Sequence, residues 1–398
     1  MKIVQINATY NKGSTGKIVA GISDVMNSFK IENYVFHSSG ENRQPYIIQY
    51  SNKSNIKLAA FKSRVFGNWG FNTGTATKVL IGMLSDIKPE VVHLHNIHGH
   101  NCDLKRLFAY FKKSKTKVVW TFHDCWAFTG YCTYFDMCKC EKWQIGCSNC
   151  VQKRQYSWFF DRSTWLFDEK KKLFSDLDLT VVTPSIWLAD LVKQSFLKNC
   201  TVEVINNGID LNVFKPKKSK IRQKYALKDK KIILGVALEW ENRKGLDVFI
   251  KLSKRLSADY KIILVGTSND VDKLLPDNII SIHRTQNQNE LAELYTAADL
   301  FVNPTREDNY PTVNIEALAC GTPVVTFKTG GSPEMLDESC GSVVECDDID
   351  ALEKEIIRIC TEKPFTETDC LNKAKEFDKN QRFKEYIELY ERIVTAGA

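Results

Sequence analysis

Short apolar runs alternate with longer amphipathic segments along the chain, and this alternation predicts a layered α/β fold. Near-continuous apolar runs are typical of strands that are buried on both faces of a parallel sheet. The strands predicted in the front half are Lys2–Ile6, Tyr34–His37, Val91–His95, Val118–His123 and Thr180–Pro184. Those predicted in the back half are Lys231–Ala237, Tyr260–Gly266, Ile279–His283, Leu300–Asn303, Pro323–Phe327 and Ser342–Val344.

Helical periodicity between these runs completes a doubly wound pattern that occurs twice. In the back half it predicts helices at Leu246–Leu256, Asn289–Ala297, Val313–Ala319 and Asp350–Cys360. Parallel strands joined by right-handed helical crossovers form doubly wound α/β domains.

The pattern restarts near residue 230, so we predict two domains. We expect an N-terminal Rossmann-like domain over 1–205, a second Rossmann-like domain over 206–379, and a terminal amphipathic helix over 380–398. The lysine-rich residues 215–220 are predicted to be the linker. Ligands of such sheets bind beyond the carboxyl ends of the strands, so two domains facing each other would share one cleft.

The composition excludes several classes of protein. Of the 398 residues, 43% are hydrophobic and 11% aromatic, which excludes wholesale disorder. The longest apolar runs fall far short of the roughly 20 residues that cross a bilayer. Because the 13 cysteines are odd in number and the N-terminus reads as a strand, we expect no secretion signal and a cytoplasmic location.

The net charge of +7 hides an asymmetry between the two halves. Residues 1–200 contain 27 Lys and Arg against 15 Asp and Glu, whereas the rest contains 28 against 33. A basic half favours an anionic partner, which could be a phosphate-bearing molecule, a membrane surface or a nucleic acid. Scattered, solvated lysines are the alternative interpretation.

Six cysteines crowd into an aromatic, irregular insertion over residues 125–150. Cys147 and Cys150 form a CxxC pair, which is half of a typical structural zinc site. Cys132 and Cys140 are the candidates for the other pair, and Cys138 or Cys125 is the alternative for one of them. A metal would order a loop that has little core of its own. Reduced cysteines without a metal are the alternative, and no catalytic metal is expected.

Five of the seven histidines fall between His93 and His123. His93 and His95 share one face of a predicted strand, and His123 ends the next strand beside Asp124. Two adjacent strand ends that deliver histidine favour a functional site, where His123 could orient a substrate hydroxyl or stabilise developing positive charge. Buried, hydrogen-bonded histidines are the alternative.

The first strand runs into a loop of small residues, Gly13-Ser14-Thr15-Gly16-Lys17. It lacks the glycine spacing of a Walker A loop and of the Rossmann fingerprint. Backbone N–H groups near Gly16, at a helix N-terminus, can approach a phosphate or a sugar hydroxyl. A plain tight turn is the alternative.

Two cations end the first strand of the back half. Arg243 and Lys244 stand just before the helix predicted to start at Leu246. Cations at a helix N-terminus suit a diphosphate, because the helix dipole also favours anions there. A solvated charge pair is the alternative.

Carboxylates follow a later strand of the back half. Glu307 and Asp308 lie in a loop, and Glu316 lies on the otherwise apolar helix that comes next. A buried carboxylate needs a partner, and vicinal ribose hydroxyls would serve. The backbone at Gly330 and Gly331, after the next strand, offers further donors.

This carboxylate segment resembles the donor domain of the retaining GT-B glycosyltransferases of family 4. Such domains carry two carboxylates separated by seven residues, followed by a run like Ala319–Val325. Asp308 and Glu316 have that spacing. Glu307 looks like the family's first glutamate if the loop holds one extra residue, so the sugar-side carboxylate is either Glu307 or Asp308.

Other segments carry the same resemblance. Arg243-Lys244-Gly245 is similar to the family's basic motif, although Glu239 stands where an arginine is often found. Asn207–Asp210, Gly13–Gly16 and Thr121–Asp124 also match. The cysteine insertion looks like that of capsular and exopolysaccharide enzymes, and the resemblance covers nearly the whole chain.

The resemblance implies a hexosyltransferase that moves a sugar, with retention, from a nucleotide-diphospho-sugar donor. Glu316 would hold the ribose, Arg243 and Lys244 the diphosphate, and Glu307 or Asp308 the sugar. His123 would approach that sugar from the front domain. The remaining residues of the implied donor site are Gly16, Asn309, Tyr310, Thr312, Gly330 and Gly331.

The resemblance also implies a role in bacterial surface polysaccharide synthesis. The acceptor would be a glycan or a lipid-pyrophosphate-linked saccharide. The basic front half would then associate peripherally with the inner face of the membrane, where lysines gain Coulomb attraction.

Several alternative functions stay open at this point. A zinc-bearing nucleic-acid-binding protein would show a basic stripe with stacking aromatics, but it would leave Glu307, Asp308 and Glu316 without a role, so no nucleic acid is expected. The others are a non-catalytic scaffold, an inverting transferase and a sugar-nucleotide epimerase on the same fold.

Overall fold

The computed structural model describes residues 1–40 and 44–396, and the chain divides into two compact units. Unit 1 comprises Met1–Asn206 and Asn380–Ala398, and unit 2 comprises Asn207–Lys379. The terminal helix predicted over 380–398 includes residues 397 and 398, which lie outside the described residues. The two units are described separately below.

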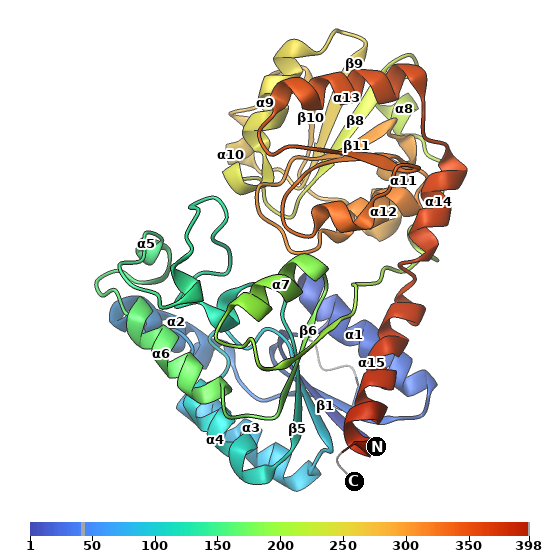
Figure 1. The fold of residues 1–398 in the computed structure, drawn as a ribbon. Coiled ribbons are helices and arrows are strands. Elements are labelled where there is room, and N and C mark those ends of the chain that lie inside the picture. Colours follow the sequence, from blue (N-terminus) through green and yellow to red (C-terminus); the bar gives the residue numbers. More distant parts are fainter. Residues whose placement is uncertain (41–43, 397–398) are drawn as a thin grey trace. The chain divides into compact units, whose positions relative to one another are not determined.

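Unit 1 is built on a parallel sheet with the strand order β3-β2-β1-β4-β5-β6-β7 (Figure 1). The strands are β1 (Lys2–Thr9), β2 (Glu32–Ser39), β3 (Ile47–Gln49), β4 (Val91–Leu94), β5 (Lys117–Thr121), β6 (Leu179–Thr183) and β7 (Thr201–Val204). The α-helices are α1 (Gly13–Ser28), α2 (Lys53–Phe66), α3 (Gly74–Ile87), α4 (Leu104–Ser114), α5 (Lys153–Tyr156), α6 (Ser163–Phe174), α7 (Ile186–Gln194) and α15 (Lys379–Thr395). Two short 3-10 helices are η1 (Trp126–Phe128) and η2 (Lys142–Gln144).

Successive residues of the central strands of unit 1 enter different cores. Val118 and Trp120 of β5 pack into one hydrophobic core, and Val119 between them packs into the other. This alternation follows from the two-residue period of a strand, and it explains why the strands read as continuous apolar runs.

Helix α15 supplies much of one of these two cores. Its residues Phe383, Tyr386 and Tyr390 are at most 2% exposed and pack with α1 and the sheet of unit 1. A Cβ at Gly21 of α1 would stand 2.4 Å from the Phe383 ring, so only glycine allows this close packing. Helix α15 thus lies where the terminal amphipathic helix was predicted.

Unit 2 is built on a second parallel sheet, with the strand order β10-β9-β8-β11-β12-β13 (Figure 1). The strands are β8 (Lys231–Val236), β9 (Tyr260–Val265), β10 (Ile279–Ile282), β11 (Leu300–Asn303), β12 (Val324–Phe327) and β13 (Gly341–Val344). The α-helices are α8 (Ile221–Lys224), α9 (Leu246–Arg255), α10 (Asn269–Asp272), α11 (Gln288–Ala297), α12 (Thr312–Ala319), α13 (Ile349–Glu362) and α14 (Glu367–Lys375). The 3-10 helices are η3 (Asn242–Lys244) and η4 (Ser332–Met335).

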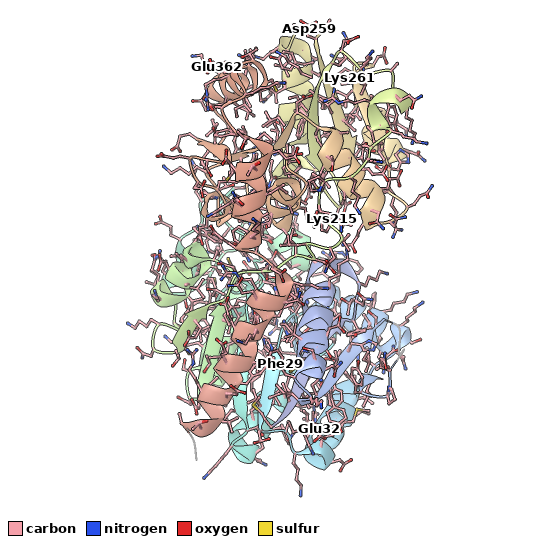
Figure 2. The ribbon with its side chains drawn as sticks, turned by 90° about the vertical axis from the view of Figure 1, so that its right-hand side faces the viewer. Phe29, Glu32, Lys215, Asp259, Lys261 and Glu362 are labelled. Atoms are coloured by element: carbon pink, nitrogen blue, oxygen red, sulfur yellow. The ribbon has the colours of Figure 1, made fainter. Side chains whose placement is uncertain are left out.

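The lysine-rich residues 215–220 belong to unit 2, so the prediction of a linker there is wrong. Phe214, just before them, is already buried in the core of unit 2. The Lys217 ammonium donates to Asn289 Oδ1 of α11 at 2.8 Å. Lys215 is exposed (Figure 2), so the lysine density marks a solvated surface, and the chain crosses between the units after Asn206.

Each sheet has a point where the strand order reverses. In unit 1 it lies between β1 and β4, and in unit 2 it lies between β8 and β11. Loops that leave such neighbouring strands diverge to opposite faces, and the crevice between them is the usual ligand site of an open parallel sheet. Among the residues that the structure describes, no helix is both long and apolar enough to cross a membrane.

Candidate functional site

Two cations stand at the strand reversal of unit 2. Arg243 and Lys244 lie in η3, between β8 and α9. Gly245 follows with φ +76°, and a Cβ there would stand 2.4 Å from the Pro304 carbonyl oxygen. A glycine is therefore required for the loop after β8 to pack against the loop after β11.

These cations contact the predicted carboxylate segment directly. The Arg243 guanidinium donates from Nη1 to the Glu307 carbonyl oxygen at 3.0 Å, and Lys244 Nζ pairs with Asp308 Oδ2 at 2.5 Å. The Lys244 and Asp308 side chains are 20% and 19% exposed, so both remain within reach of solvent. The structure thus brings together four residues that sequence reasoning placed in one site.

A third loop, after β12, closes on the same segment. Gly330 has φ +54°, and a Cβ there would lie 1.8 Å from the Asp308 carbonyl oxygen. The Thr329 hydroxyl donates to the Thr305 carbonyl oxygen at 2.7 Å, which ties this loop to the one after β11. Gly331 follows in the same loop and is buried. The loops of β8, β11 and β12 therefore converge around Asp308, whose neighbours Asn309 and Tyr310 are also buried.

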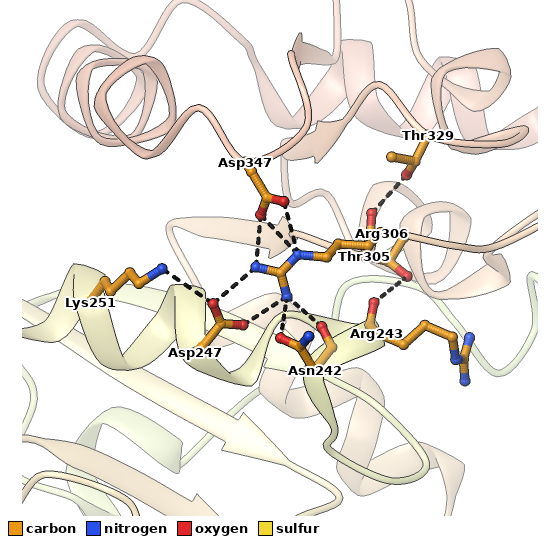
Figure 3. Close-up of polar contacts among 8 residues, drawn as sticks. All are labelled: Asn242, Arg243, Asp247, Lys251, Thr305, Arg306, Thr329 and Asp347. Carbon is orange, nitrogen blue, oxygen red and sulfur yellow. Dashed lines mark hydrogen bonds and ion pairs between the residues drawn. The ribbon is translucent and has the colours of Figure 1, made fainter. Parts of the chain in front are cut away.

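Arg306 holds this loop arrangement together, and sequence reasoning missed it. Its guanidinium, with the side chain 9% exposed, forms a fork with Asp247 of α9 at 2.8 and 2.9 Å and pairs with Asp347 at 2.7 Å (Figure 3). It also donates to Asn242 of η3. In return, the Arg306 backbone N–H donates to the Arg243 carbonyl oxygen at 2.8 Å. Arg306 thereby fixes the backbone that carries Arg243.

Replacing Arg306 by lysine should lower the free energy of unfolding by about 1–3 kcal/mol, because one ammonium cannot bond two carboxylates in a fork. Urea unfolding measures this change. The matched control is Arg255→Lys, since Arg255 also pairs with two carboxylates, Asp350 and Glu353, but on the surface. A control that loses as much stability as Arg306→Lys would contradict this role for Arg306.

Glu316 lies on α12, eight positions after Asp308, and its partner comes from α11. The Tyr295 hydroxyl donates to Glu316 Oε2 at 3.1 Å, and the Tyr295 ring is fully buried. Burial, followed by the neighbouring Glu316 charge, raises the pKa of Tyr295 well above its ordinary value, so the phenol stays a donor. Thr312, also predicted for the site, opens the same helix.

A hydrogen-bonded chain of side chains lies at the strand reversal of unit 1. Gln5 Nε2 donates to the Val19 carbonyl oxygen, which turns its Oε1 toward His95 Nε2 at 3.1 Å. His95 Nε2 therefore donates, and its Nδ1 faces His123 Nε2 at 3.1 Å. If both rings are neutral, His123 Nε2 must carry the proton and donate to His95 Nδ1. The lone pair of the His123 ring is then on His123 Nδ1.

Asp124 follows His123 in the sequence, and its carboxylate bonds to His98 and to the backbone of Trp126. Its Oδ2 accepts from His98 Nε2 at 2.8 Å, and its Oδ1 accepts from the Trp126 backbone N–H at 2.9 Å. Burial tends to raise the pKa of Asp124, but His98 and the Trp126 N–H outweigh it and lower the pKa. His98, the partner of Asp124, is a residue that sequence reasoning left without a role.

His123 should be neutral throughout the physiological pH range. Burial lowers its pKa to about 4, although the Asp124 charge opposes this shift. The ¹⁵N chemical shifts of the His123 imidazole in the full chain should therefore stay those of a neutral ring as the pH falls from about 8 to about 5.5. A titration of His123 near its ordinary pKa of about 6.5 would contradict the hydrogen-bond chain.

The small-residue loop after β1 forms the first turn of α1. Gly16 lies inside this turn, where its carbonyl oxygen accepts from the Asn11 N–H at 3.0 Å. A Cβ at Gly16 would stand 2.9 Å from the Thr9 hydroxyl oxygen. Small size at Gly16 is thus explained by local packing, and its contact with a donor stays a prediction.

Two of the four cysteines predicted to bind zinc lie side by side. Cys132 Sγ and Cys150 Sγ are 3.9 Å apart, close to the separation of about 3.8 Å expected for two thiolates on tetrahedral zinc. Cys147 Sγ accepts from the Gly130 N–H at 3.2 Å. Across residues 1–40 and 44–396, however, no three His, Cys, Asp or Glu side chains gather into a group that could hold a metal. The separation of one pair, Cys132 and Cys150, therefore fits zinc.

Zinc binding by Cys132, Cys140, Cys147 and Cys150 stays a prediction. We expect about one zinc per chain in protein purified without added metal, measured by elemental analysis. A Cys147→Ser/Cys150→Ser variant should lose that zinc, whereas Cys200→Ser should retain it. Metal-free wild-type protein would refute the prediction.

Comparisons with known proteins agree with this architecture. Residues 217–384 match the family described as glycosyl transferases group 1, and residues 31–213 match the family described as Glycosyltransferase Family 4. Sucrose-phosphate synthase from Thermosynechococcus elongatus superposes with a TM-score of 0.72 at 16% identity, over 99% of both chains. Anabaena HepE in complex with UDP superposes with a TM-score of 0.68 at 15% identity, over 98% of this chain and all of that one.

The chain is a glycosyltransferase with the GT-B fold, built from two Rossmann-like domains. It is similar to WcaC of Escherichia coli K12, described as a colanic acid biosynthesis glycosyl transferase, with 25% identity over 88% of this chain and 87% of that protein. It is also similar, with 29% identity over 42% of this chain and 49% of the relative, to a Corynebacterium glutamicum enzyme. That enzyme is described as a GDP-mannose-dependent mannosyltransferase of a monoacylated phosphatidylinositol monomannoside.

Proposed function

We propose that the enzyme transfers a hexose, with retention of the anomeric configuration, from a nucleotide-diphospho-sugar to a glycan or lipid-linked saccharide. The observation that carries this proposal is the convergence of Arg243, Lys244 and the Glu307–Asp308 segment at the strand reversal of unit 2. A diphosphate needs cations that are accessible and held in place, and this cluster offers both.

Each group in this cluster has a distinct task in the proposed reaction. As the bond between the sugar and the diphosphate breaks, negative charge grows on the leaving phosphate, and Arg243 and Lys244 stabilise it. Lys244 must then exchange its contact with Asp308 for the phosphate, which frees the Asp308 carboxylate for donor-sugar hydroxyls. Glu316, held by Tyr295, accepts from the ribose hydroxyls.

The remaining predicted residues would complete the donor site. Glu307 is the alternative sugar-side carboxylate, and the backbone of Asn309, Gly330 and Gly331 offers N–H donors. A contact of His123 with the sugar stays a prediction. Cationic side chains can stabilise the diphosphate without a divalent ion, so we expect activity in the presence of a chelator.

Relatives support the proposed donor and pathway. Anabaena HepE has been solved with UDP-glucose, and WcaC is described as acting in colanic acid biosynthesis. The C. glutamicum relative is described as acting on a lipid-linked acceptor. A role in bacterial surface polysaccharide synthesis, such as capsule or exopolysaccharide, fits these relatives and the basic front half.

A panel of nucleotide sugars tests the proposal through thermal shift of the full chain. We expect one sugar nucleotide to raise Tm in wild type and to do so much less in Arg243→Ala, while free nucleoside has little effect. Incubating that donor with candidate acceptors and assigning the product anomer by NMR separates the outcomes. An inverted product would indicate an inverting transferase, and an altered sugar on the nucleotide would indicate an epimerase. No stabilisation by any sugar nucleotide would refute the proposal.

A further inference from the structure

A stretch of unit 1 combines positive charge with apolar side chains that face solvent. From residue 44 to residue 85 the chain has five Lys or Arg and no Asp or Glu. Helix α2 lies within this stretch and exposes Leu58 by 53%, Phe61 by 57% and Phe66 by 50%. Leu58 and Phe61 are three positions apart, so they lie on one face of the helix, and the exposed Lys57 and Lys62 flank them.

Three consecutive aromatic residues lie beside this helix. Trp158, Phe159 and Phe160, just after α5, are 54%, 64% and 50% exposed. The Trp158 backbone N–H donates to the Arg64 carbonyl oxygen at 2.7 Å. The Trp158 ring packs edge-on against the Phe61 ring, with 6.0 Å between the ring centroids. The segment that follows α5 and helix α2 therefore form one surface of unit 1.

The backbone beneath these aromatics is firmly held, so their exposure is not that of a loose loop. Ser157 is fully buried, and its N–H donates to the Lys153 carbonyl oxygen at 2.8 Å. The Tyr131 hydroxyl contacts the carbonyl oxygens of Gly67 and Phe160 at 2.8 and 3.4 Å, which joins the end of α2 to this segment. Large apolar side chains held outward in a group mark an interaction surface.

Basic residues outnumber acidic ones around the aromatics. Lys153, Arg154 and Arg162 flank the three rings in sequence. Asp161 is the one acid in residues 151–163. It is exposed, and its carboxylate oxygens accept from the backbone N–H groups of Cys150 and Ser163 at 2.7 and 2.9 Å. Residues 151–163 therefore carry a net positive charge, with three Lys or Arg against one Asp.

We propose that this aromatic–basic patch, formed by Leu58, Phe61, Phe66, Trp158, Phe159 and Phe160 with the lysines of α2, docks the enzyme on an anionic phospholipid bilayer. Aromatic rings insert at the level of the headgroups, and lysines around them gain from the negative surface potential. A second copy of this chain fits less well, because a two-fold contact would place the same lysines against each other. The proposal deepens the lipid-linked acceptor of the proposed function, but its test measures binding alone and can fail while sugar transfer stands.

Vesicle flotation of the full chain tests the proposal. We expect wild type to float with phosphatidylcholine vesicles that contain about 30 mol% phosphatidylglycerol, and to bind pure phosphatidylcholine at least about tenfold more weakly. About 0.5 M NaCl should release much of the bound protein, because it screens the lysines. Wild type that stays unbound to anionic vesicles would overturn the proposal.

Two variants assign the binding to the patch. The aromatic variant, Trp158→Ser/Phe159→Ser/Phe160→Ser, should lose at least about tenfold in vesicle affinity. The lysine variant, Lys53→Glu/Lys57→Glu/Lys62→Glu, should lose a similar factor. Because its changes are on the surface of α2, it tests the patch independently should the aromatic variant fold poorly. The control is Phe29→Ser/Leu274→Ser, which removes two apolar side chains that are 52% and 61% exposed elsewhere. Vesicle binding unchanged in both patch variants would overturn the assignment. The assignment would also be overturned if wild type binds no vesicles, sediments as a dimer, and becomes a monomer in the aromatic variant.

Discussion

The Lys244→Ala variant should lose at least about tenfold in turnover, and up to about a hundredfold, while its fold survives. A hydrogen bond to a charged group contributes about 1.5–3 kcal/mol, and each 1.36 kcal/mol of transition-state stabilisation is a factor of ten in rate. Lys244 is placed for such a bond, because its ammonium stands at the strand reversal of unit 2 and already binds a carboxylate, Asp308, at 2.5 Å. The loss should fall mainly on kcat, since charge on the leaving phosphate grows in the transition state.

Two further substitutions make this result interpretable. Lys244→Arg keeps the charge but not the compact shape of the ammonium, so it should recover part of the rate. Lys254→Ala removes an exposed lysine from the last turn of α9 and should turn over like wild type. Initial rates with saturating donor, with thermal melting to check the fold, are the measurement. A wild-type rate in Lys244→Ala would remove this lysine from the site.

The Glu316→Gln variant should lose at least about tenfold in kcat/KM for the donor. Unlike the loss in Lys244→Ala, this loss should fall mainly on KM. Glu316 accepts from Tyr295 on one oxygen, and a carboxylate can accept from two ribose hydroxyls at once, whereas the amide of glutamine has a single acceptor oxygen. The ribose is bound in both the ground state and the transition state, so the loss should appear as a higher KM for the donor, with kcat changed much less. The change is nearly isosteric, and α12 should keep its packing.

The matched control for this variant is Glu338→Gln, which changes an exposed glutamate of unit 2 in the same way. It should leave both kcat and KM unchanged. A deoxy-ribose donor analogue provides the second check: if Glu316 holds the ribose, wild type and Glu316→Gln should differ much less on that analogue. An undiminished difference would place Glu316 elsewhere in the mechanism.

The strands buried on both faces could be predicted from the sequence to within one or two residues, except β1, which runs three residues past its predicted end at Ile6. Every residue of β11 is buried, so its apolar run has sharp ends. The strands that were missed, β3 and β7, lie at the two edges of the sheet in unit 1. All four residues of β7 are exposed or half-buried, and such a strand has no continuous apolar run to reveal it.

The residues of the site were predictable where the fold itself brings them together. Arg243, Lys244 and Asp308 follow strands that are neighbours in the sheet, so a correct strand order places them side by side. The supporting residues were not predictable in this way. Arg306 bonds to Asp247 and Asp347, and the sequence gives no sign of which distant carboxylates a loop arginine will meet.

The same limit explains the pairing of the histidines. Asp124 stands next to His123 in the sequence, but its carboxylate accepts from His98, which comes from the loop after β4. Contacts of this kind depend on the path of the backbone through two loops, and apolar periodicity carries no information about that path.

The location of the donor diphosphate tests the account most directly. A crystal of the enzyme soaked with the sugar nucleotide that raises its Tm should show phosphate oxygens within about 3 Å of Lys244 Nζ, with the ribose against Glu316. Phosphates bound at any other part of the chain, with Lys244 still paired to Asp308, would contradict the account.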